Sequence, residues 1–188
     1  MHNLDRAPHL PHFGGKIAVE AAVMKSGMEW TILRPNNFYQ NDIWFKDVML
    51  QHGVYPQPIG NAGVSRVDVR DIGEVAVAAL TTGGHDKKIY NLVGPEVVTG
   101  ESTAADWSRA FGKPIRYAGD DLDAWEAQNR EYLPSSMLYD FKHMYAFFQK
   151  DGLKATPTDL AQLTSVLGHP PRGFAAYASE MAVAWKSS

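Results

Sequence analysis

The sequence contains no cysteine, which excludes disulfide bonds, thiolate zinc sites and a cysteine nucleophile. It has no run of Lys and Arg that would grip a phosphate backbone, and its formal net charge is -3, so direct binding to nucleic acid is not expected. No apolar stretch is long enough to cross a bilayer, and the polar, proline-containing N-terminus does not have the apolar centre of a signal peptide. We therefore expect a cytoplasmic protein that does not enter a membrane.

The sequence also has few residues that suit a metal ion. His9 and His12 have H-x-x-H spacing, but Pro8 and Pro11 oppose the helix that would bring both rings onto one ion. No third ligand is evident, and the G-x-S-x-G motif of a serine hydrolase does not occur. We therefore predict no metal site.

What is present is an alternation of strands and helices along 188 residues. Apolar runs bounded by turn residues predict strands at 29–34, 64–69, 88–94 and 115–117. Helical periodicity and end signals predict helices at 15–26, 42–51, 71–82 and 100–111, and several more from residue 120 onward. This order favours an α/β fold in one domain, 1–188, with an α/β part over 1–118 and a helical C-terminal lobe over 119–188.

Two of these helices have clear start signals. Asp71 is expected to cap one helix, with Glu74 completing a capping box and Leu80 on the buried side. Thr99 is expected to cap the next helix, which Gly112 would end.

The segment RPNNFYQN follows the first predicted strand, at an end where parallel sheets bind their ligands. Pro35 stiffens the turn, Asn36 and Asn37 offer amides, and Phe38 offers a flat wall. A nicotinamide ring needs this combination of an aromatic face and hydrogen bonds, so these four residues are candidate cofactor-binding residues. A plain Asn-rich turn is the simpler alternative.

Lys16 lies at the start of the first predicted helix. Its ammonium group has three donors on a long stem and would suit the hydroxyls of a ribose. A solvated surface lysine, or one weakly paired with Glu20 one turn later, is the alternative.

The segment from Pro11 to Asn41 resembles the NmrA-like family, a branch of the atypical short-chain dehydrogenases. The family pattern is H-F-x-x-K-x-x-x-E, then a helix and a strand ending in L-R-P-x-x-F-x-x-N. It is matched by His12, Phe13, Lys16, Glu20, Leu33, Arg34, Pro35, Phe38 and Asn41. The later segments VDVRDIGEVAVAAL and LGHPPRGFAAYASEMAVAW are also similar to the family, so the resemblance covers nearly the whole chain.

The resemblance implies a partial Rossmann-like fold, a doubly wound parallel sheet that binds NADP. In this family a glycine-rich loop after the first strand holds the pyrophosphate, and no such loop occurs in this sequence. The chain is therefore expected to be a C-terminal portion of the family fold that binds NADP weakly or not at all. It is also expected to expose an apolar sheet edge that favours self-association.

The resemblance further implies an NAD(P)H-dependent oxidoreductase of a small carbonyl or quinone-like substrate. Typical short-chain dehydrogenases use Tyr-x-x-x-Lys, and this chain has His12-Phe-Gly-Gly-Lys16. Lys16 and His12 are therefore the candidate catalytic residues, with Lys16 orienting the ribose and His12 moving a proton. The residues expected to line the substrate pocket are Phe13, Tyr39, Asn41 and Trp44.

The missing tyrosine leaves a second interpretation open. The protein would then be a non-catalytic sensor of NADP(H) that acts through protein partners, and its surface would carry the function. The sequence does not decide between an enzyme that binds a dinucleotide and a small substrate and such a sensor.

Overall fold

The structure, a computed structural model, describes residues 2, 4–6 and 8–186, except for the side chain of residue 12. Its α-helices are α1 (Pro11–Lys25), α2 (Lys46–His52), α3 (Val69–Thr81), α4 (Gly100–Phe111), α5 (Leu122–Asn129), α6 (Ser135–Asp151), α7 (Pro157–Leu167) and α8 (Phe174–Lys186). Its strands are β1 (Thr31–Pro35), β2 (Val54–Tyr55), β3 (Lys88–Leu92) and β4 (Arg116–Tyr117), and its two 3₁₀-helices are η1 (Leu4–Arg6) and η2 (Tyr39–Phe45). None of these helices is both long enough and apolar enough to span a membrane.

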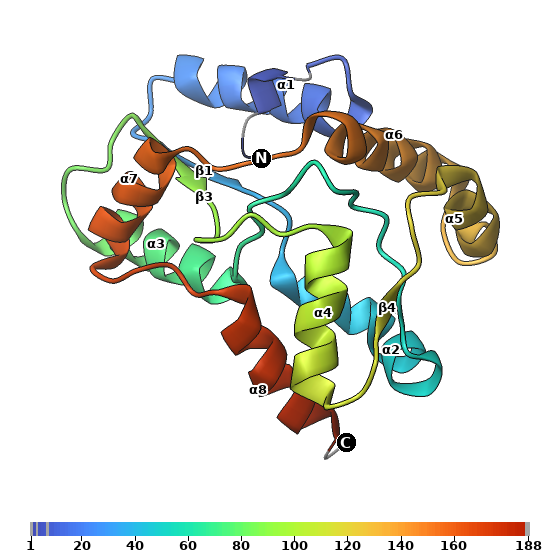
Figure 1. Ribbon diagram of the computed structural model, residues 1–188. Helices are drawn as coiled ribbons and strands as arrows, with labels where there is room; N and C mark the ends of the chain where they lie inside the picture. The colour runs from blue at the N-terminus through green and yellow to red at the C-terminus, as the bar shows by residue number, and fades with distance from the viewer. Residues whose placement is uncertain (1, 3, 7, 187–188) are drawn as a thin grey trace.

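The strands form two parallel pairs. Strand β1 pairs with β3, with Thr31 opposite Lys88 and Pro35 opposite Leu92, and β2 pairs with β4. Parallel neighbours need a crossover, and the chain between β1 and β3 supplies one that contains α3 (Figure 1). The predicted α/β class with parallel strands is therefore confirmed, and three of the four predicted strands are present.

The fourth predicted strand, at 64–69, belongs to neither pair. Val64 makes isolated bridges with Val98 and Leu153, and Val67 makes one with Phe38. Because the segment changes partner within a few residues, no continuous ladder forms. It still runs extended through the interior, where it carries a buried arginine into the site described below.

Helix α3 begins earlier than predicted. Asp68, not Asp71, is its N-cap, and the Asp68 carboxylate accepts a hydrogen bond from a backbone N–H two residues later. Asp71 and Glu74 instead bind the guanidinium of Arg172, so the predicted capping box does not form. Leu80 is 85% exposed, and its predicted place on the buried side is wrong.

Two other helix ends are informative. Helix α1 begins at Pro11, four residues before the predicted start, because proline is tolerated in the first turn, where its missing N–H has no partner to lose. Helix α4 begins as predicted, with Thr99 and Ser102 forming a capping box, and Gly112 ends it in the left-handed conformation.

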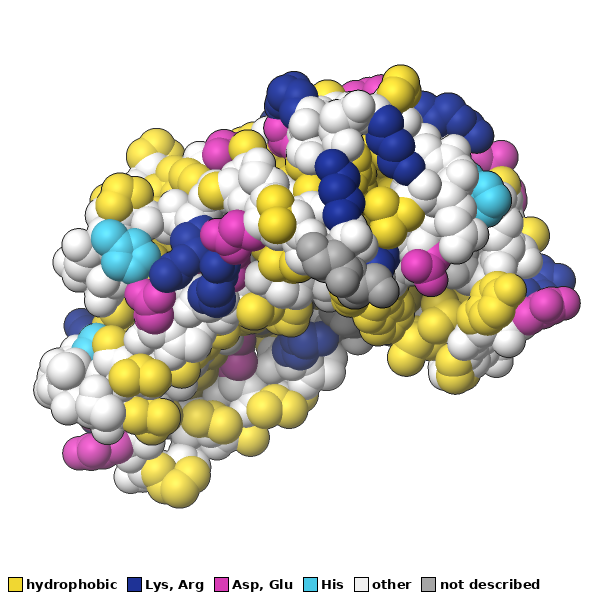
Figure 2. All heavy atoms as spheres, turned by 90° about the horizontal axis from the view of Figure 1, so that it is seen from below, with side chains coloured by type: hydrophobic (Ala, Val, Ile, Leu, Met, Phe, Trp, Pro, Cys, Tyr) yellow, Lys and Arg dark blue, Asp and Glu magenta, His cyan; other side chains and the backbone are white. Residues whose placement is uncertain are grey.

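The four helices after residue 118 pack in three places (Figure 1). Helices α5 and α6 pack against each other, and α6 lies against α1. Helix α7 packs on α3 and β3, and α8 packs along α4. On the face that Figure 2 shows, hydrophobic side chains reach the surface among charged side chains of both signs.

Helix α1 covers little apolar surface. Phe13 is fully buried, but Val19 is 63% exposed and Met24 is 39% exposed. Its three alanines are also exposed, so mainly the N-terminal part of α1 packs against the fold.

Strand β1 is paired on one side only. The N–H of Asn36 donates to the carbonyl of Leu92, on the side of β3. Because alternate residues of a parallel strand direct their backbone groups to the same side, Thr31 and Leu33 direct theirs to the opposite edge. No strand in the described part of the chain pairs with that edge. An open edge beside an exposed apolar helix is a template for association.

We predict that the chain self-associates through this face. Val19→Glu places a charge on α1 beside the open edge and should lower the mean mass measured by light scattering at high protein concentration, because burial of a carboxylate opposes association. Val77→Glu is the matched control, since Val77 is 61% exposed on α3 and the change in net charge is the same. A wild-type chain that stays monomeric would contradict the prediction.

Candidate functional site

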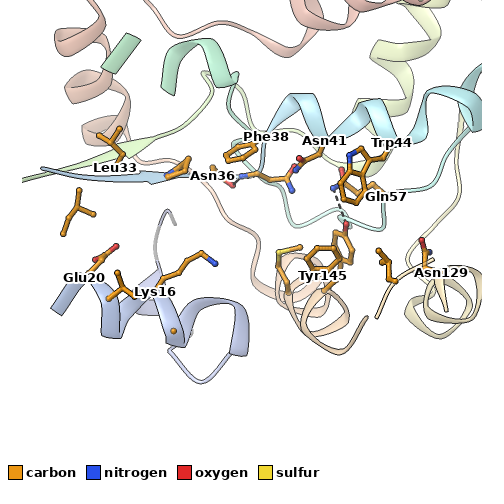
Figure 3. Close-up of a pocket in the computed structure, with 18 of the residues that line it drawn as sticks. Lys16, Glu20, Leu33, Asn36, Phe38, Asn41, Trp44, Gln57, Asn129 and Tyr145 are labelled. Atoms are coloured by element: carbon orange, nitrogen blue, oxygen red, sulfur yellow. Dashed lines mark hydrogen bonds between the residues drawn. The ribbon is translucent and has the colours of Figure 1, made fainter. Parts of the chain in front are cut away.

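A cavity of about 740 Å³ lies between α1, the turn after β1, η2 and the α5–α6 pair. Figure 3 shows the side chain of Lys16 extending from α1 into this space, across from Asn36 and Phe38 of the turn. Seven of the residues singled out in the sequence line the cavity: Lys16, Pro35, Asn36, Asn37, Phe38, Asn41 and Trp44. The fold thus places Lys16 of α1 and the turn after β1 at the same cavity.

Three other candidates lie elsewhere or are not described. Phe13 is buried and packs edge-on against Phe147, with ring centroids 5.7 Å apart. Tyr39 is also buried, and its hydroxyl donates to the carbonyl of Arg172 at 3.2 Å. Neither lines the cavity. The side chain of His12 lies outside the described part of the structure.

The asparagines of the turn are largely occupied in holding it. The Asn36 amide nitrogen donates to the Leu153 carbonyl at 2.8 Å, and its side-chain oxygen accepts from the Asn37 N–H at 2.7 Å. The Asn37 side-chain oxygen accepts from Arg66 at 2.8 Å. These bonds give the cavity a rigid wall, because both side chains are buried and each is tied to a different segment of the chain.

Glu20 is paired with a residue other than Lys16. Its carboxylate accepts from Arg34 Nε at 3.1 Å and from Arg34 Nη2 at 2.6 Å. This two-pronged ion pair fastens α1 to β1, with both side chains only 12–13% exposed. The two motif residues therefore have a structural role, and Glu20 is engaged at the wall of the cavity that also carries Lys16.

The far end of the cavity is aromatic. Trp44 of η2, which is 70% exposed, faces Trp125 of α5 and Phe141 and Tyr145 of α6 across this end. Gln57, which is buried, donates to the Tyr145 hydroxyl at 3.4 Å (Figure 3). The sequence gave no signal for Gln57, which stands between two prolines.

Beneath the turn lies a fully buried ion pair. Arg66 Nη2 and Asp42 Oδ1 are 2.6 Å apart, and both side chains are 0% exposed. Arg66 also donates to the Phe38 carbonyl at 2.7 Å, and Trp107 Nε1 donates to Asp42 at 2.9 Å. Burial tends to lower the pKa of Arg66, but the neighbouring Asp42 carboxylate raises it above its ordinary value, so the guanidinium stays charged.

Sequence reasoning missed this pair, although one signal was available. A charged residue inside the apolar run VSRVDV is expected to have a partner when it is buried. The identity of that partner, 24 residues earlier, depends on how the chain folds back and is not encoded in any local spacing.

The cavity therefore has a cationic end, a rim of turn amides and an aromatic end. Such a site can hold a flat ring between aromatic faces and give hydrogen bonds to hydroxyl or carbonyl oxygens. Within the described residues, no group of three or more His, Asp or Glu side chains is placed to hold a metal ion.

The sequence matches the NmrA-like family over residues 2–174, and the chain belongs to this family. It is 35% identical over 164 residues to an NAD(P)H azoreductase of Xenophilus azovorans, covering 87% of this chain and 56% of that protein. It is 34% identical over 166 residues to a (4-alkanoyl-5-oxo-2,5-dihydrofuran-3-yl)methyl phosphate reductase of Streptomyces griseus, covering 88% of this chain and 58% of that protein. The chain thus spans little more than half the length of these relatives.

Solved structures resemble the fold. An NADPH-dependent quinone oxidoreductase of Escherichia coli, in complex with NADPH, matches with a TM-score of 0.84 at 24% identity, covering 96% of this chain and 63% of that one. A triphenylmethane reductase of Citrobacter matches with a TM-score of 0.75 at 20% identity, covering 93% of this chain and 60% of that one. The partial Rossmann-like fold predicted from the sequence is confirmed.

We predict that Asp42→Asn destabilises the protein by about 3–5 kcal/mol, because Arg66 is then a buried charge without a counter-ion. The measurement is the free energy of unfolding in urea, followed by tryptophan fluorescence. Asp123→Asn is the control, since Asp123 is bound to Lys142 but its side chain is 90% exposed. Equal stability of the two variants would contradict the role given to the buried pair.

Proposed function

We propose that this chain forms the nicotinamide and substrate end of the active site of an NAD(P)H-dependent oxidoreductase that reduces flat, quinone-like acceptors. The observation that carries the proposal is the cavity, in which a lysine, the turn amides and aromatic rings from separate elements line one space. Its volume of about 740 Å³ is in the range of small-molecule and cofactor sites.

The residues of the cavity suit distinct parts of such a complex. Lys16 would donate hydrogen bonds to the ribose hydroxyls, and Pro35 and Phe38 would support the nicotinamide ring. Asn36 and Asn37 would hold the turn in place. Asn41 and Trp44 belong to the substrate side, where Trp44 provides a flat apolar face. When bound, the cofactor supplies a hydride; the protein positions both rings and excludes water from between them.

Two assignments from the sequence stay predictions. His12 as the group that moves a proton rests on its place in the family motif. A cytoplasmic location rests on the composition. Phe13 and Tyr39, which do not line the cavity, are better assigned to positioning α1 and η2 than to direct contact with substrate.

The relatives support the reaction class. The two similar proteins reported above are named as an NAD(P)H azoreductase and as a reductase of an unsaturated lactone phosphate, and a structural neighbour is an NADPH-dependent quinone oxidoreductase. Quinones, azo compounds and such lactones share a conjugated, planar group that accepts a hydride. An aromatic end of the cavity suits a planar group of this kind.

The lysine, the turn and the volume of the cavity suit the nicotinamide riboside part of NADPH, but the sequence offers no glycine-rich loop for the pyrophosphate. We therefore predict that the chain by itself binds NADPH with a dissociation constant of about 1 mM or weaker in isothermal titration. Reduced nicotinamide mononucleotide, which has no adenosine phosphate, should bind about equally well. A micromolar constant for NADPH would contradict this prediction.

The role of Lys16 can be tested in a longer polypeptide to which a glycine-rich half is added, as the resemblance to the NmrA-like family implies. Lys16→Met should lower kcat/KM for NADPH oxidation by a soluble naphthoquinone about 10- to 100-fold, because charged hydrogen bonds to the ribose are lost. Lys25→Met is the control at the other end of α1 and should change little, since Lys25 does not line the cavity. Equal rates for the two variants would remove Lys16 from the site.

The same restored polypeptide tests the alternative of a sensor. Tight binding of NADPH without turnover of any naphthoquinone or azo dye would favour a regulatory protein that reads the cofactor through protein partners. Turnover would support the oxidoreductase.

A further inference from the structure

The aromatic end of the cavity contains a hydroxyl group whose surroundings are well defined. Tyr145 is 5% exposed and lies edge-on to Trp125, with ring centroids 5.2 Å apart. Both residues line the cavity. The amide nitrogen of Gln57 donates to the Tyr145 hydroxyl oxygen at 3.4 Å (Figure 3).

The direction of this hydrogen bond follows from Arg66, which can only donate. Arg66 Nη1 donates to the Tyr55 hydroxyl oxygen at 3.2 Å. The Tyr55 proton then goes to Gln57 Oε1 at 2.7 Å, which is much nearer than Asp42 Oδ1 at 3.4 Å. With its oxygen occupied by Tyr55, the Gln57 amide presents its nitrogen to Tyr145.

The proton of Tyr145 is therefore left to point away from Gln57. Among the described residues the hydroxyl donates no hydrogen bond, and Tyr145 is one of the residues that line the cavity. Burial raises the pKa of Tyr145, so the group keeps its proton near neutral pH. A protonated, buried donor without an acceptor is costly until a ligand supplies one.

We propose that Tyr145 is the hydrogen-bond donor that selects and orients an electron-rich acceptor atom, such as the carbonyl oxygen of a quinone, at the aromatic end of the cavity. The inference rests on the proposed function for its substrate class. It adds that Arg66 fixes Tyr145 as a donor through Tyr55 and Gln57. Planar ligands that carry a suitably placed acceptor should then bind better than hydrocarbons of the same shape.

The test compares two ligands on the chain as it stands. Naphthoquinone sulfonate and naphthalene sulfonate have the same fused rings and the same charge, but only the first carries carbonyl oxygens. Binding is followed by quenching of Trp44 and Trp125, which both line the cavity. The absence of cysteine removes thiol addition to the quinone as a side reaction.

Wild-type protein should bind the quinone about fivefold more tightly than the hydrocarbon, and Tyr145→Phe should remove that preference while leaving the affinity for the hydrocarbon unchanged. Tyr139→Phe is the matched control, because Tyr139 lies on the same helix but is 58% exposed and does not line the cavity.

Gln57 gives a second, independent measurement. An ionised glutamate at this position can only accept, so Gln57→Glu should draw the Tyr145 proton toward itself and abolish the preference although the hydroxyl is still present. A methionine at this position does not donate and accepts only weakly, so the Tyr145 proton stays available in Gln57→Met. This variant should therefore retain a preference for the quinone. A purely structural role of Tyr145 predicts no such difference between the two variants.

The outcomes separate the two proposals. If wild-type protein prefers the quinone and Tyr145→Phe keeps that preference, Tyr145 is not the donor, while the proposed function stands. If Tyr139→Phe loses the preference as well, the effect belongs to α6 in general and the assignment is overturned. If wild-type protein binds neither ligand, the proposed function fails, and the assignment of Tyr145 fails with it.

Discussion

The buried ion pair between Arg66 and Asp42 is the constraint on which the site depends. Removing both charges from water costs several kcal/mol per ion, and the pair persists because each member is satisfied on several sides. Arg66 holds Asn37 and the Phe38 carbonyl, while Asp42 accepts from Trp107 as well. The turn that lines the cavity is thus held in place by the interior of the protein, and binding of a ligand there would not have to order it.

The pair also connects the cavity with the interior of the protein. Trp107 stacks on both Phe111 and Trp185, with ring centroids 5.2 Å and 4.9 Å away, so the residue that donates to Asp42 also joins α4 to α8. In the other direction, Arg66 reaches Tyr145 through two further side chains. The buried Arg66 guanidinium therefore fixes the shape of the turn and also determines that the Tyr145 hydroxyl, at the aromatic end, accepts from Gln57.

Much of this architecture was predictable from local patterns. Apolar runs predicted β1 and β3, and the cap at Thr99 predicted the start of α4. The family motif predicted that Lys16 and the turn from Pro35 to Phe38 lie at one cavity. Where prediction failed, the deciding interaction came from far along the chain. Asp71 has the spacing of a cap, but Arg172 binds it from 101 residues away. The roles of Arg66 and Gln57 are likewise set by partners that only the folded chain brings near.

The ion pair between Glu20 and Arg34 has a consequence for how the cavity opens. Lys16 lies on α1, whereas the amides opposite it are fixed to the interior, and this electrostatic clasp is a principal tie between the two walls. The position of α1 relative to the turn, and with it the width of the cavity, therefore depends in part on this ion pair. A substitution of Arg34, which does not itself line the cavity, can therefore change how a ligand fits while every residue of the cavity wall stays the same.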